Sequence, residues 1–280
     1  MAESSNNPEI QTPELPRRIP GSKPILFLAI LFVAATFLAW YFSWFGRELS
    51  DADISKYLAD EKNPRHVQHA LLQVQQRMER GDTSAKNWYP QLVTLSGSPE
   101  TEFRLTVAWL MGFDNKATEF HEALLKLLRD PEPIVRRNAA LALVRFQDSS
   151  GRDELVSMLK PYMLKAPASG VVASSMQEGA TVGRRTPLAR IEQPDGKVVE
   201  LRSPLPGRVN KILKPNGSQV SQDEDWISLN SDEESVWEAL RALAIVGTAA
   251  DLPVIQSYTE SASGRIKEQA QLTAKAISRR

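Results

Sequence analysis

The sequence contains no cysteine. This absence excludes a disulfide framework, thiol catalysis and a thiolate metal site, and it removes the residue that a lipoprotein anchor requires. Histidine is also scarce, with 3 residues in the 280 of the chain. His66 and His69 are spaced so that both could reach one metal ion from a single helix face, but no third ligand accompanies them. We therefore predict no metal site, and a packing or surface role for both histidines.

Net charge is absent as well, because 34 basic residues balance 34 acidic ones. A neutral chain offers no electrostatic attraction for nucleic acid. The sequence has no serine nucleophile elbow, phosphate-binding loop or dinucleotide fingerprint. Its paired acids lie at expected helix starts and in a turn, where the helix dipole and solvent account for them. We therefore expect no catalytic residues, no cofactor and no nucleic-acid partner, and we predict that the protein is not an enzyme.

One long hydrophobic run is present, since the 21 residues from Ile25 to Phe45 carry no charge. A helix of this length spans a hydrocarbon core of roughly 30 Å. A cleaved signal peptide and a buried core helix are the alternatives, but signal peptides have a shorter apolar region and a small-residue cleavage site, which this run lacks. We therefore predict one transmembrane helix over residues 24–46, after a disordered tail over residues 1–23 that is rich in Pro, Ser, Asn and Glu.

The basic residues around this run favour one orientation in the membrane. Arg17, Arg18 and Lys23 precede it, whereas Arg47 and Lys56 follow it. Because the flank with more Lys and Arg tends to stay in the cytoplasm, the region after the span is expected outside it. The predicted location is a bacterial inner membrane, with the C-terminal region in the periplasm if the source is Gram-negative.

A helical repeat follows the predicted span. A capping residue and a proline recur at intervals of 35 and 32 residues, and each pair predicts the start of a helix. These pairs are Asn63-Pro64, Ser98-Pro99 and Asp130-Pro131. Second helices are expected at Trp88–Leu95, Phe120–Leu128 and Glu154–Leu159. Repeated helix pairs form a solenoid, in which each unit buries its apolar face against its neighbours.

The stretch "DPEPIVRRNAALALVRF" resembles a HEAT repeat of the phycobilisome-lyase type. Asp130, Pro131, Val135, Arg136 and Ala139 stand in the family's places. The pattern returns in "EESVWEALRALAIVG", which starts at Glu233. The resemblance implies HEAT-like repeats that bind other proteins, over residues 47–160 and 232–280. It also suggests a bilin-handling chaperone, although a membrane span and a β segment are foreign to that class.

Residues 161–231 have a two-residue period and repeat themselves. Three positions match at an offset of 37 residues, namely Pro167 with Pro204, Gly170 with Gly207 and Val172 with Val209. Four more match at an offset of 38, namely Gly179 with Gly217, Val182 with Val220, Leu188 with Trp226 and Ile191 with Leu229. Matching turn glycines and inward apolar residues predict two copies of one β unit with one inserted residue.

These two copies resemble the halves of the biotinyl/lipoyl-like barrel-sandwich domain, through "APASGVV…EGATV…PLARIE" and "SPLPGRV…NGSQV…WISLN". The resemblance implies a barrel-sandwich hybrid, as found in cofactor carriers and in periplasmic adaptor proteins. Adaptors have a long α-hairpin between the halves, and this chain has only a tight turn. Cell-wall zinc metallopeptidases have related barrels, but their histidines are absent from this segment.

The turn between the halves contains Lys197, which is a low-probability attachment site. In biotinyl and lipoyl carriers the modified lysine lies at the apex of this turn, and Lys197 follows the turn Pro194-Asp195-Gly196. The flanking residues that modifying enzymes read are missing. A surface lysine is the other interpretation. The segment also has arginines that could form a basic side, namely Arg184, Arg185, Arg190, Arg202 and Arg208.

These features together predict an α+β multidomain chain, in which a small all-β barrel-sandwich interrupts an α-solenoid after one transmembrane helix. The function that we expect is a membrane-anchored scaffold or adaptor that binds proteins of an envelope complex. The alternative is a carrier or accessory subunit of a membrane enzyme, with Lys197 biotinylated or lipoylated.

Overall fold

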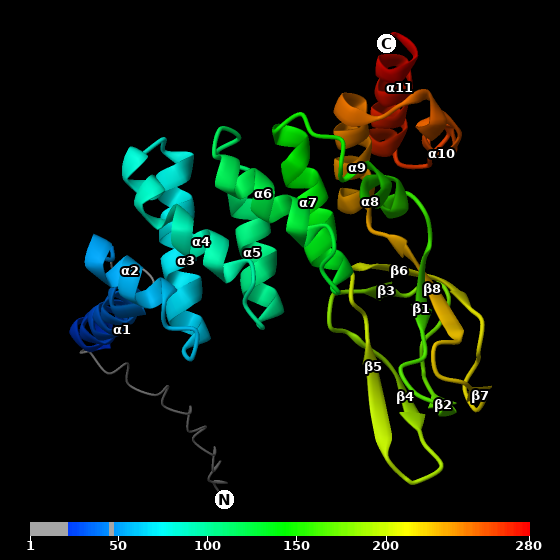
Figure 1. The fold of residues 1–280 in the computed structure, drawn as a ribbon. Helices are drawn as coiled ribbons and strands as arrows, with labels where there is room; N and C mark the ends of the chain where they lie inside the picture. Colours follow the sequence, from blue (N-terminus) through cyan, green and yellow to red (C-terminus); the bar gives the residue numbers. More distant parts are fainter. Residues whose placement is uncertain (1–21, 45–47) are drawn as a thin grey trace, which may run out of the picture. The chain divides into compact units, whose positions relative to one another are not determined.

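The structure is a computed structural model that describes residues 22–44 and 48–280 (Figure 1). The chain divides into two compact units, Met1–Glu48 and Leu49–Arg280. In the first unit the described secondary structure is helix α1, Ser22–Trp44. Residues 1–21 of the predicted tail lie outside the described residues, and so does Phe45.

Helix α1 is apolar around its whole circumference, and every side chain from Lys23 to Tyr41 is exposed. A surface helix of a globular domain has an apolar stripe and a polar side, so this pattern is not typical of one. The segment Lys23–Tyr41, of 19 residues, is long and apolar enough to cross a membrane. A signal sequence can have the same length and composition. The orientation stays a prediction.

The second unit begins as a stack of paired helices (Figure 1). Before the strands these are α2 Asp51–Leu58, α3 Pro64–Glu79, α4 Tyr89–Leu95, α5 Thr101–Met111, α6 Thr118–Leu127, α7 Pro133–Arg145 and α8 Arg152–Met158, with the 3-10 helix η1 Thr83–Trp88 leading into α4. After the strands come α9 Glu233–Val246, the 3-10 helix η2 Ala249–Asp251, α10 Leu252–Gln256 and α11 Gly264–Ser278. The three predicted second helices correspond to α4, α6 and α8, so the expected pairing is confirmed.

Two of the predicted helix starts are wrong by two residues. Helix α5 has Glu100 at its N-cap and α7 has Glu132, rather than Ser98 and Asp130. The side chains of Ser98 and Asp130 instead accept hydrogen bonds from the N–H groups of Glu100 and Glu132, at 3.2 and 2.9 Å. Each forms a turn that precedes the helix. In α7 it is Pro133 that occupies the first turn, and it keeps Glu132 extended.

Equivalent arginines connect successive repeats. Arg104 of α5 donates to the carbonyl of Ser98 in its own turn at 2.9 Å and to Asp130 of the next repeat at 2.7 Å. One repeat later, Arg136 donates to the carbonyl of Asp130 at 2.8 Å and to Glu154 at 3.1 Å. Because Asp130 is buried, its pairing with Arg104 compensates for its lost hydration. These contacts of Arg104 and Arg136 therefore fix the register of one repeat on the next.

The helical stack continues across the inserted strands. A single buried cluster combines residues of α7 and α8, such as Ala140 and Leu155, with residues of α9 and α11, such as Leu240 and Ala270. Arg152 also donates two hydrogen bonds to the buried carboxylate of Asp251, at 2.8 and 2.6 Å. Helices on both sides of the β segment thus share one core.

The β segment forms two four-stranded antiparallel sheets, and neither closes into a barrel. The strands are β1 Tyr162–Lys165, β2 Gly170–Ala173, β3 Thr181–Val182, β4 Pro187–Glu192, β5 Val198–Arg202, β6 Gly207–Ile212, β7 Gln219–Val220 and β8 Asp225–Ser231. One sheet has the order β1-β8-β6-β3 and the other β5-β4-β2-β7. Residues 161–231 are called the β-module below.

The predicted duplication is confirmed by this topology. Replacing β1, β2, β3 and β4 by β5, β6, β7 and β8, and the reverse, converts the strand order of one sheet into that of the other. Each sheet therefore takes two strands from each half of the sequence, and the halves are interleaved. A Cβ on Gly170 would collide with the carbonyl of Glu192, and one on Gly207 with that of Asn230. Both glycines are needed because the backbones of two paired strands of the same half approach closely there, β2 with β4 and β6 with β8.

Candidate functional site

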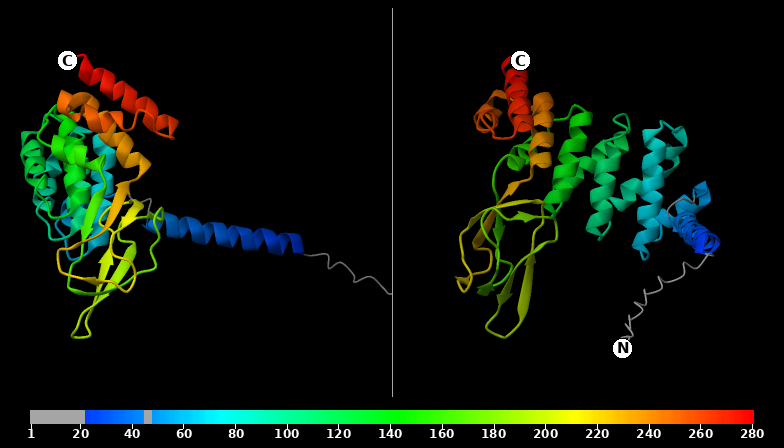
Figure 2. Two further views of the ribbon diagram at one scale, coloured as in Figure 1. Left: turned by 90° about the vertical axis from the view of Figure 1, so that its right-hand side faces the viewer. Right: turned by 180° about the vertical axis from the view of Figure 1, so that it is seen from behind.

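Lys197 lies at the turn of the β4–β5 hairpin. Figures 1 and 2 show this hairpin at the end of the β-module that points away from α7 and α9. The N–H of Gln193 donates to the carbonyl of Lys197 at 2.8 Å, and Gly196 supplies a φ of +80° for the turn. The ammonium of Lys197 is 3.0 Å from Asp195, and its side chain is 78% exposed. The hydrogen bond from Lys197 lowers the pKa of the Asp195 carboxyl. The lysine is therefore accessible, and its pairing is local.

The two clustered histidines have separate partners. The ring of His66 stacks on Tyr57 at 4.2 Å and lies 2.9 Å from a carboxylate oxygen of Asp60. His69 instead lies 3.1 Å from the side-chain amide of Gln73. In residues 22–44 and 48–280 no cluster of three or more His, Asp or Glu side chains could hold a metal ion. His66 therefore connects α3 to Tyr57 and Asp60, whereas the contact of His69 with Gln73 lies within α3.

The arginines of the β-module do not form one basic side, which corrects the prediction. Arg184 and Arg185, in the turn after β3, both form ion pairs with Glu102 of α5. Arg202 pairs with Glu200 on its own strand at 2.7 Å. The remaining exposed pair, Arg190 and Arg208, lies on different sheets. The sequence pattern did not show that a helix one repeat away supplies an acidic partner.

An exposed aromatic cluster lies where α5 meets α7. Trp109 is 40% exposed and packs edge-on against Phe113, with ring centroids 4.7 Å apart. The guanidinium of Arg145 lies 5.2 Å from the Phe113 ring centre, and it donates to the carbonyl of Gly112 at 3.3 Å. No carboxylate lies within ion-pair distance of Arg145 in residues 48–280, although its charge acts on Glu238 of α9 from further away, so its guanidinium can still pair with an acidic group of a partner.

Helix α9 presents a similar cluster. Trp237 is covered by Arg241 and Arg265, whose guanidinium carbons lie 4.5 and 4.0 Å from the ring centre. Figure 1 shows α5, α7 and α9 in succession along the stack, and α7 packs against both of the others. We call the first cluster, Trp109, Phe113 and Arg145, the aromatic–arginine face. Trp and Arg are the residues that contribute most often to protein–protein binding energy.

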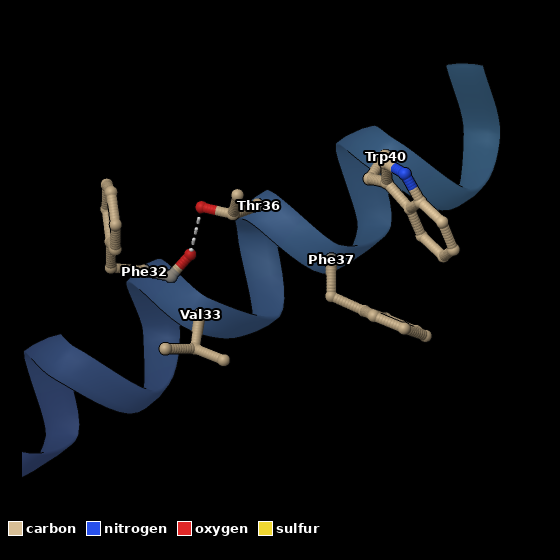
Figure 3. Close-up of a pocket in the computed structure, with 5 residues that line it drawn as sticks. All are labelled: Phe32, Val33, Thr36, Phe37 and Trp40. Carbon is tan, nitrogen blue, oxygen red and sulfur yellow. Dashed lines mark hydrogen bonds between the residues drawn. The ribbon is translucent and has the colours of Figure 1, made fainter. Parts of the chain in front are cut away.

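A shallow depression on α1 is lined by Phe32, Val33, Thr36, Phe37 and Trp40 (Figure 3). The hydroxyl of Thr36 donates to the carbonyl of Phe32 at 2.8 Å. The hydroxyl is therefore satisfied within the helix, as expected for a helix surrounded by lipid. All five side chains belong to one helix, so the described residues supply no opposing wall that could enclose a ligand.

Comparison with known proteins supports the assignment of the helical part. A family model described as HEAT repeats matches residues 89–176. The chain therefore has a HEAT-repeat region at residues 89–176. The match starts at α4 and extends past β2, so its last part covers strands instead of a helix pair. No curated protein matches. A solved structure described as "Crystal Structure of Engineered Protein" is 16% identical, with 81% of this chain and 78% of that chain covered and a TM-score of 0.44.

Sequence reasoning missed the aromatic–arginine face. Trp109 and Arg145 stand next to apolar residues in the sequence and could have been assigned to the core. The sequence nevertheless contains a signal, because neither residue falls on the apolar positions that define the core side of its helix, such as Val107 in α5 and Leu143 in α7, which are buried. Reading the helices for exposed aromatic residues would have found Trp109.

Proposed function

We propose that this protein is a membrane-anchored scaffold whose HEAT repeats bind other proteins of a bacterial envelope complex. Three observations support the proposal: the HEAT match, the apolar helix α1 and the aromatic–arginine face. HEAT repeats stack into extended surfaces that are used for protein binding. The C-terminal region lies outside the cytoplasm in this proposal.

The observation that carries the proposal is the exposure of Trp109 beside Arg145. Trp109 packs on Phe113 but leaves 40% of its surface exposed beside the guanidinium of Arg145, and a partner that covers this exposed part would bury further apolar area. Trp109 does not contribute to the buried core of α5, which consists of Phe103, Val107, Leu110 and their neighbours. A partner with an apolar side chain flanked by acidic groups fits Trp109 and the unpaired Arg145.

The β-module is, in this proposal, an unmodified biotinyl/lipoyl-like barrel-sandwich domain. Its support is the interleaving of two similar halves and the hairpin that joins them. The short β4–β5 turn argues against an efflux adaptor, because no α-hairpin follows Glu192. The proposal assigns no catalytic residue and no cofactor, since no catalytic constellation was found.

A crosslinking experiment in intact membranes tests the scaffold. A photoreactive amino acid replaces Trp109, and the matched control carries it at Glu122, an exposed residue of α6. We expect a discrete adduct from position 109 and none from position 122. Recovery of the same abundant proteins from both positions would refute the assignment of the binding face.

A carrier is the second candidate, and the exposed Lys197 at the hairpin turn favours it. In that case the Lys197 amine, after losing a proton, would form an amide with the carboxyl group of biotin or lipoate that a cofactor ligase has activated, and the activating group would leave with the bond that it made to this carboxyl group. The intact mass of protein produced together with the cofactor ligases decides between the two. An unmodified mass eliminates the carrier, and the Lys197→Arg variant shows whether any added mass belongs to this residue.

The orientation requires a separate test. Alkaline phosphatase fused after Arg280 is active only if that end is exported. An inactive fusion, together with an active cytoplasmic reporter at the same position, would place the helical stack and the β-module in the cytoplasm and would overturn the envelope part of the proposal.

A further inference from the structure

The β-module joins the helical stack through a narrow neck. The chain enters β1 soon after α8, and it leaves β8 for α9 with Asp232 alone between them. Strands β1 and β8 are antiparallel neighbours, with Tyr162 opposite Leu229, so the two connections lie side by side. Two adjacent connections leave a domain free to tilt unless other contacts hold it.

Arg137 of α7 lies at this neck and is only 2% exposed. One of its terminal nitrogens lies 3.4 Å from the hydroxyl of Ser231, and its Nε lies 3.8 Å from Glu154. That Nε has no hydrogen-bond partner among the described residues. An unmatched buried donor is unfavourable, so the neck alone is a poor determinant of one fixed orientation.

The three apolar cores do not supply the missing constraint. The buried core of the β-module, which includes Val172, Val209 and Trp226, shares no residue with the two helical cores. Within residues 49–280 no strand has an extensive packing contact with a helix. The module therefore has a core of its own, and a change in its orientation would leave that core intact.

A polar contact supplies the constraint at a distance from the neck. Arg184 and Arg185 lie in the turn between β3 and β4, and both reach Glu102 in the first turn of α5. This turn is fixed internally, because the N–H of Arg185 donates to the carbonyl of Ser203 at 2.7 Å and that of Gly183 donates to the hydroxyl of Thr186 at 3.0 Å. A rigid turn thus delivers two guanidinium groups to one carboxylate.

We propose that Glu102, Arg184 and Arg185 form a releasable latch that holds the β-module in one orientation on the helical stack, with the neck at Arg137 as its pivot. When the latch opens, the β-module tilts at the neck and the β4–β5 hairpin moves relative to α5. An acidic partner that competes for the two arginines opens the latch. High salt opens it too, because the side chains are 29% exposed for Glu102, 22% for Arg184 and 64% for Arg185, which leaves all three charges within reach of ions.

The test measures a distance between the two parts in the full-length chain in detergent. Because the sequence has no cysteine, spin labels can be placed on cysteines that replace Glu192 of β4 and Lys126 of α6, which are both exposed. We expect one narrow distance distribution at low salt. The Glu102→Arg variant should raise the population outside that peak roughly fivefold, which corresponds to the loss of a partly exposed ion-pair network.

Two further variants make the result decisive. Glu119→Arg is the matched control, because Glu119 is an exposed acid in the first turn of α6 and forms no ion pair in the described part of the chain. The charge swap that combines Glu102→Arg with Arg184→Glu and Arg185→Glu should restore the narrow peak. An unchanged distribution in Glu102→Arg, or a swap that leaves it broad, would overturn the latch.

A salt titration of the labelled chain without latch substitutions guards against misfolding of the variants. Raising sodium chloride from about 0.05 to 1 M shortens the screening length from over 10 Å to about 3 Å. We expect the same broadening as in Glu102→Arg, reversible on dilution. A distribution that is insensitive to salt would contradict the proposal even if no charge-reversed variant folds.

Discussion

Gly179 and Gly217 occupy the same position in the two halves of the β-module. Their φ angles are +82° and +83°, and each donates its N–H at 2.8 Å to a valine carbonyl of the other half, Gly179 to Val209 and Gly217 to Val172. A residue with a Cβ rarely adopts this backbone conformation. The paired turns therefore bind the two halves together through the backbone.

The first prediction concerns Gly217→Ala. No atom lies within 4 Å of the position of a Cβ on Gly217, so the effect isolates the backbone strain of a positive φ. We expect the free energy of unfolding to fall by about 1 kcal/mol, measured by urea unfolding of the full-length chain in detergent. Gly264→Ala is the control, since Gly264 also has open space around it but no positive φ. An equal effect at both positions would contradict this explanation.

Gly207→Ala should be worse than Gly217→Ala. The new Cβ would meet the backbone carbonyl of Asn230, which cannot move without breaking the pairing of β6 with β8. We expect a loss of about 3 kcal/mol, in the upper part of the range for overpacking. Hydrogen exchange distinguishes a local effect, because the β-module should lose protection while α5 and α7 keep theirs. Loss of protection throughout the stack would show that the β-module is not an independent core.

The sequence was sufficient to predict the duplication and even its one irregularity. The offset between the halves changes from 37 to 38 residues after Val209. The structure explains this change as a β-bulge, because the register of β6 on β8 shifts between Val209 and Lys211, which leaves Asn210 as the additional residue. A period of two residues and matched glycines depend on local geometry alone, and local geometry is what sequence patterns report.

Contacts between distant segments could not be predicted in this way. The pairing of Arg184 with Glu102 joins residues 82 positions apart, and nothing in either local pattern specifies the other. The helix starts of α5 and α7 were missed for a local reason, because Ser98 and Asp130 accept from N–H groups two residues on and form a turn before the helix. The exposure of Trp109 depends on how α5 packs, which only the assembled stack defines.

Asp251 gives the chain a pH dependence in the acid range. Burial opposes ionisation of this carboxyl, but hydrogen bonds from Arg152 and from the N–H of Thr248 outweigh that effect, and the pKa of Asp251 is lowered. An acid whose pKa is lower in the folded state stabilises the fold above its unfolded pKa, and this contribution disappears as the pH falls below about 4. Asp251→Asn should therefore lower stability at pH 7 by about 2 kcal/mol and reduce the acid sensitivity of the melting temperature.

The control for Asp251 is Asp153, which forms an ion pair with the same arginine, Arg152. Asp153 lies 3.5 Å from Arg152 but its side chain is 99% exposed. Asp153→Asn should leave the thermal unfolding curve nearly unchanged at pH 7 and at acid pH, because a fully solvated ion pair contributes little to stability. A similar loss in both variants would mean that the charge of Arg152, and not the burial of its partner, determines the effect.

Glu238 and Glu234 of α9 should respond in opposite directions. Glu238 is an exposed residue, but neighbouring atoms desolvate its carboxyl in part, and this desolvation, with the nearby Glu234 and Asp232, raises its pKa. The hydrogen bond from Arg265 lowers the pKa of Glu234. A raised pKa makes the ionised form of Glu238 unfavourable, and this penalty is relieved as the pH falls through the folded pKa. Glu238→Gln should thus stabilise the chain at pH 7, whereas Glu234→Gln should destabilise it.

Thermal unfolding at pH 7 and pH 4 checks this pair. The gain in Glu238→Gln should vanish at the lower pH, where the wild-type carboxyl is protonated, and the loss in Glu234→Gln should shrink there as well. If Glu238→Gln destabilises the chain at pH 7, its carboxylate must form a favourable contact with Arg145 or Arg241 that outweighs the repulsion.

The last prediction separates folding from binding by comparing two tryptophans. Trp88 is 1% exposed, and its indole N–H donates to the hydroxyl of Ser55 at 2.9 Å. Trp88→Ala should cost about 4 kcal/mol, as for other buried aromatic residues. Trp109 is 40% exposed, so Trp109→Ala should cost less than about 1.5 kcal/mol. Both values follow from thermal and urea unfolding of the full-length chain.

Per folded molecule, Trp109→Ala should reduce partner binding more than Trp88→Ala does, which is the reverse of their effects on stability. Because Trp109 is proposed to be covered by a partner, Trp109→Ala should abolish the crosslink formed from a photoreactive residue at the exposed position Asn115, which lies beside the backbone carbonyl of Arg145, although the protein is folded and abundant in the membrane. Trp88→Ala should reduce that crosslink only in proportion to the folded protein that remains. If Trp109→Ala leaves the crosslink intact, Trp109 is a surface residue without a binding role, and the partner surface must be sought elsewhere on the stack.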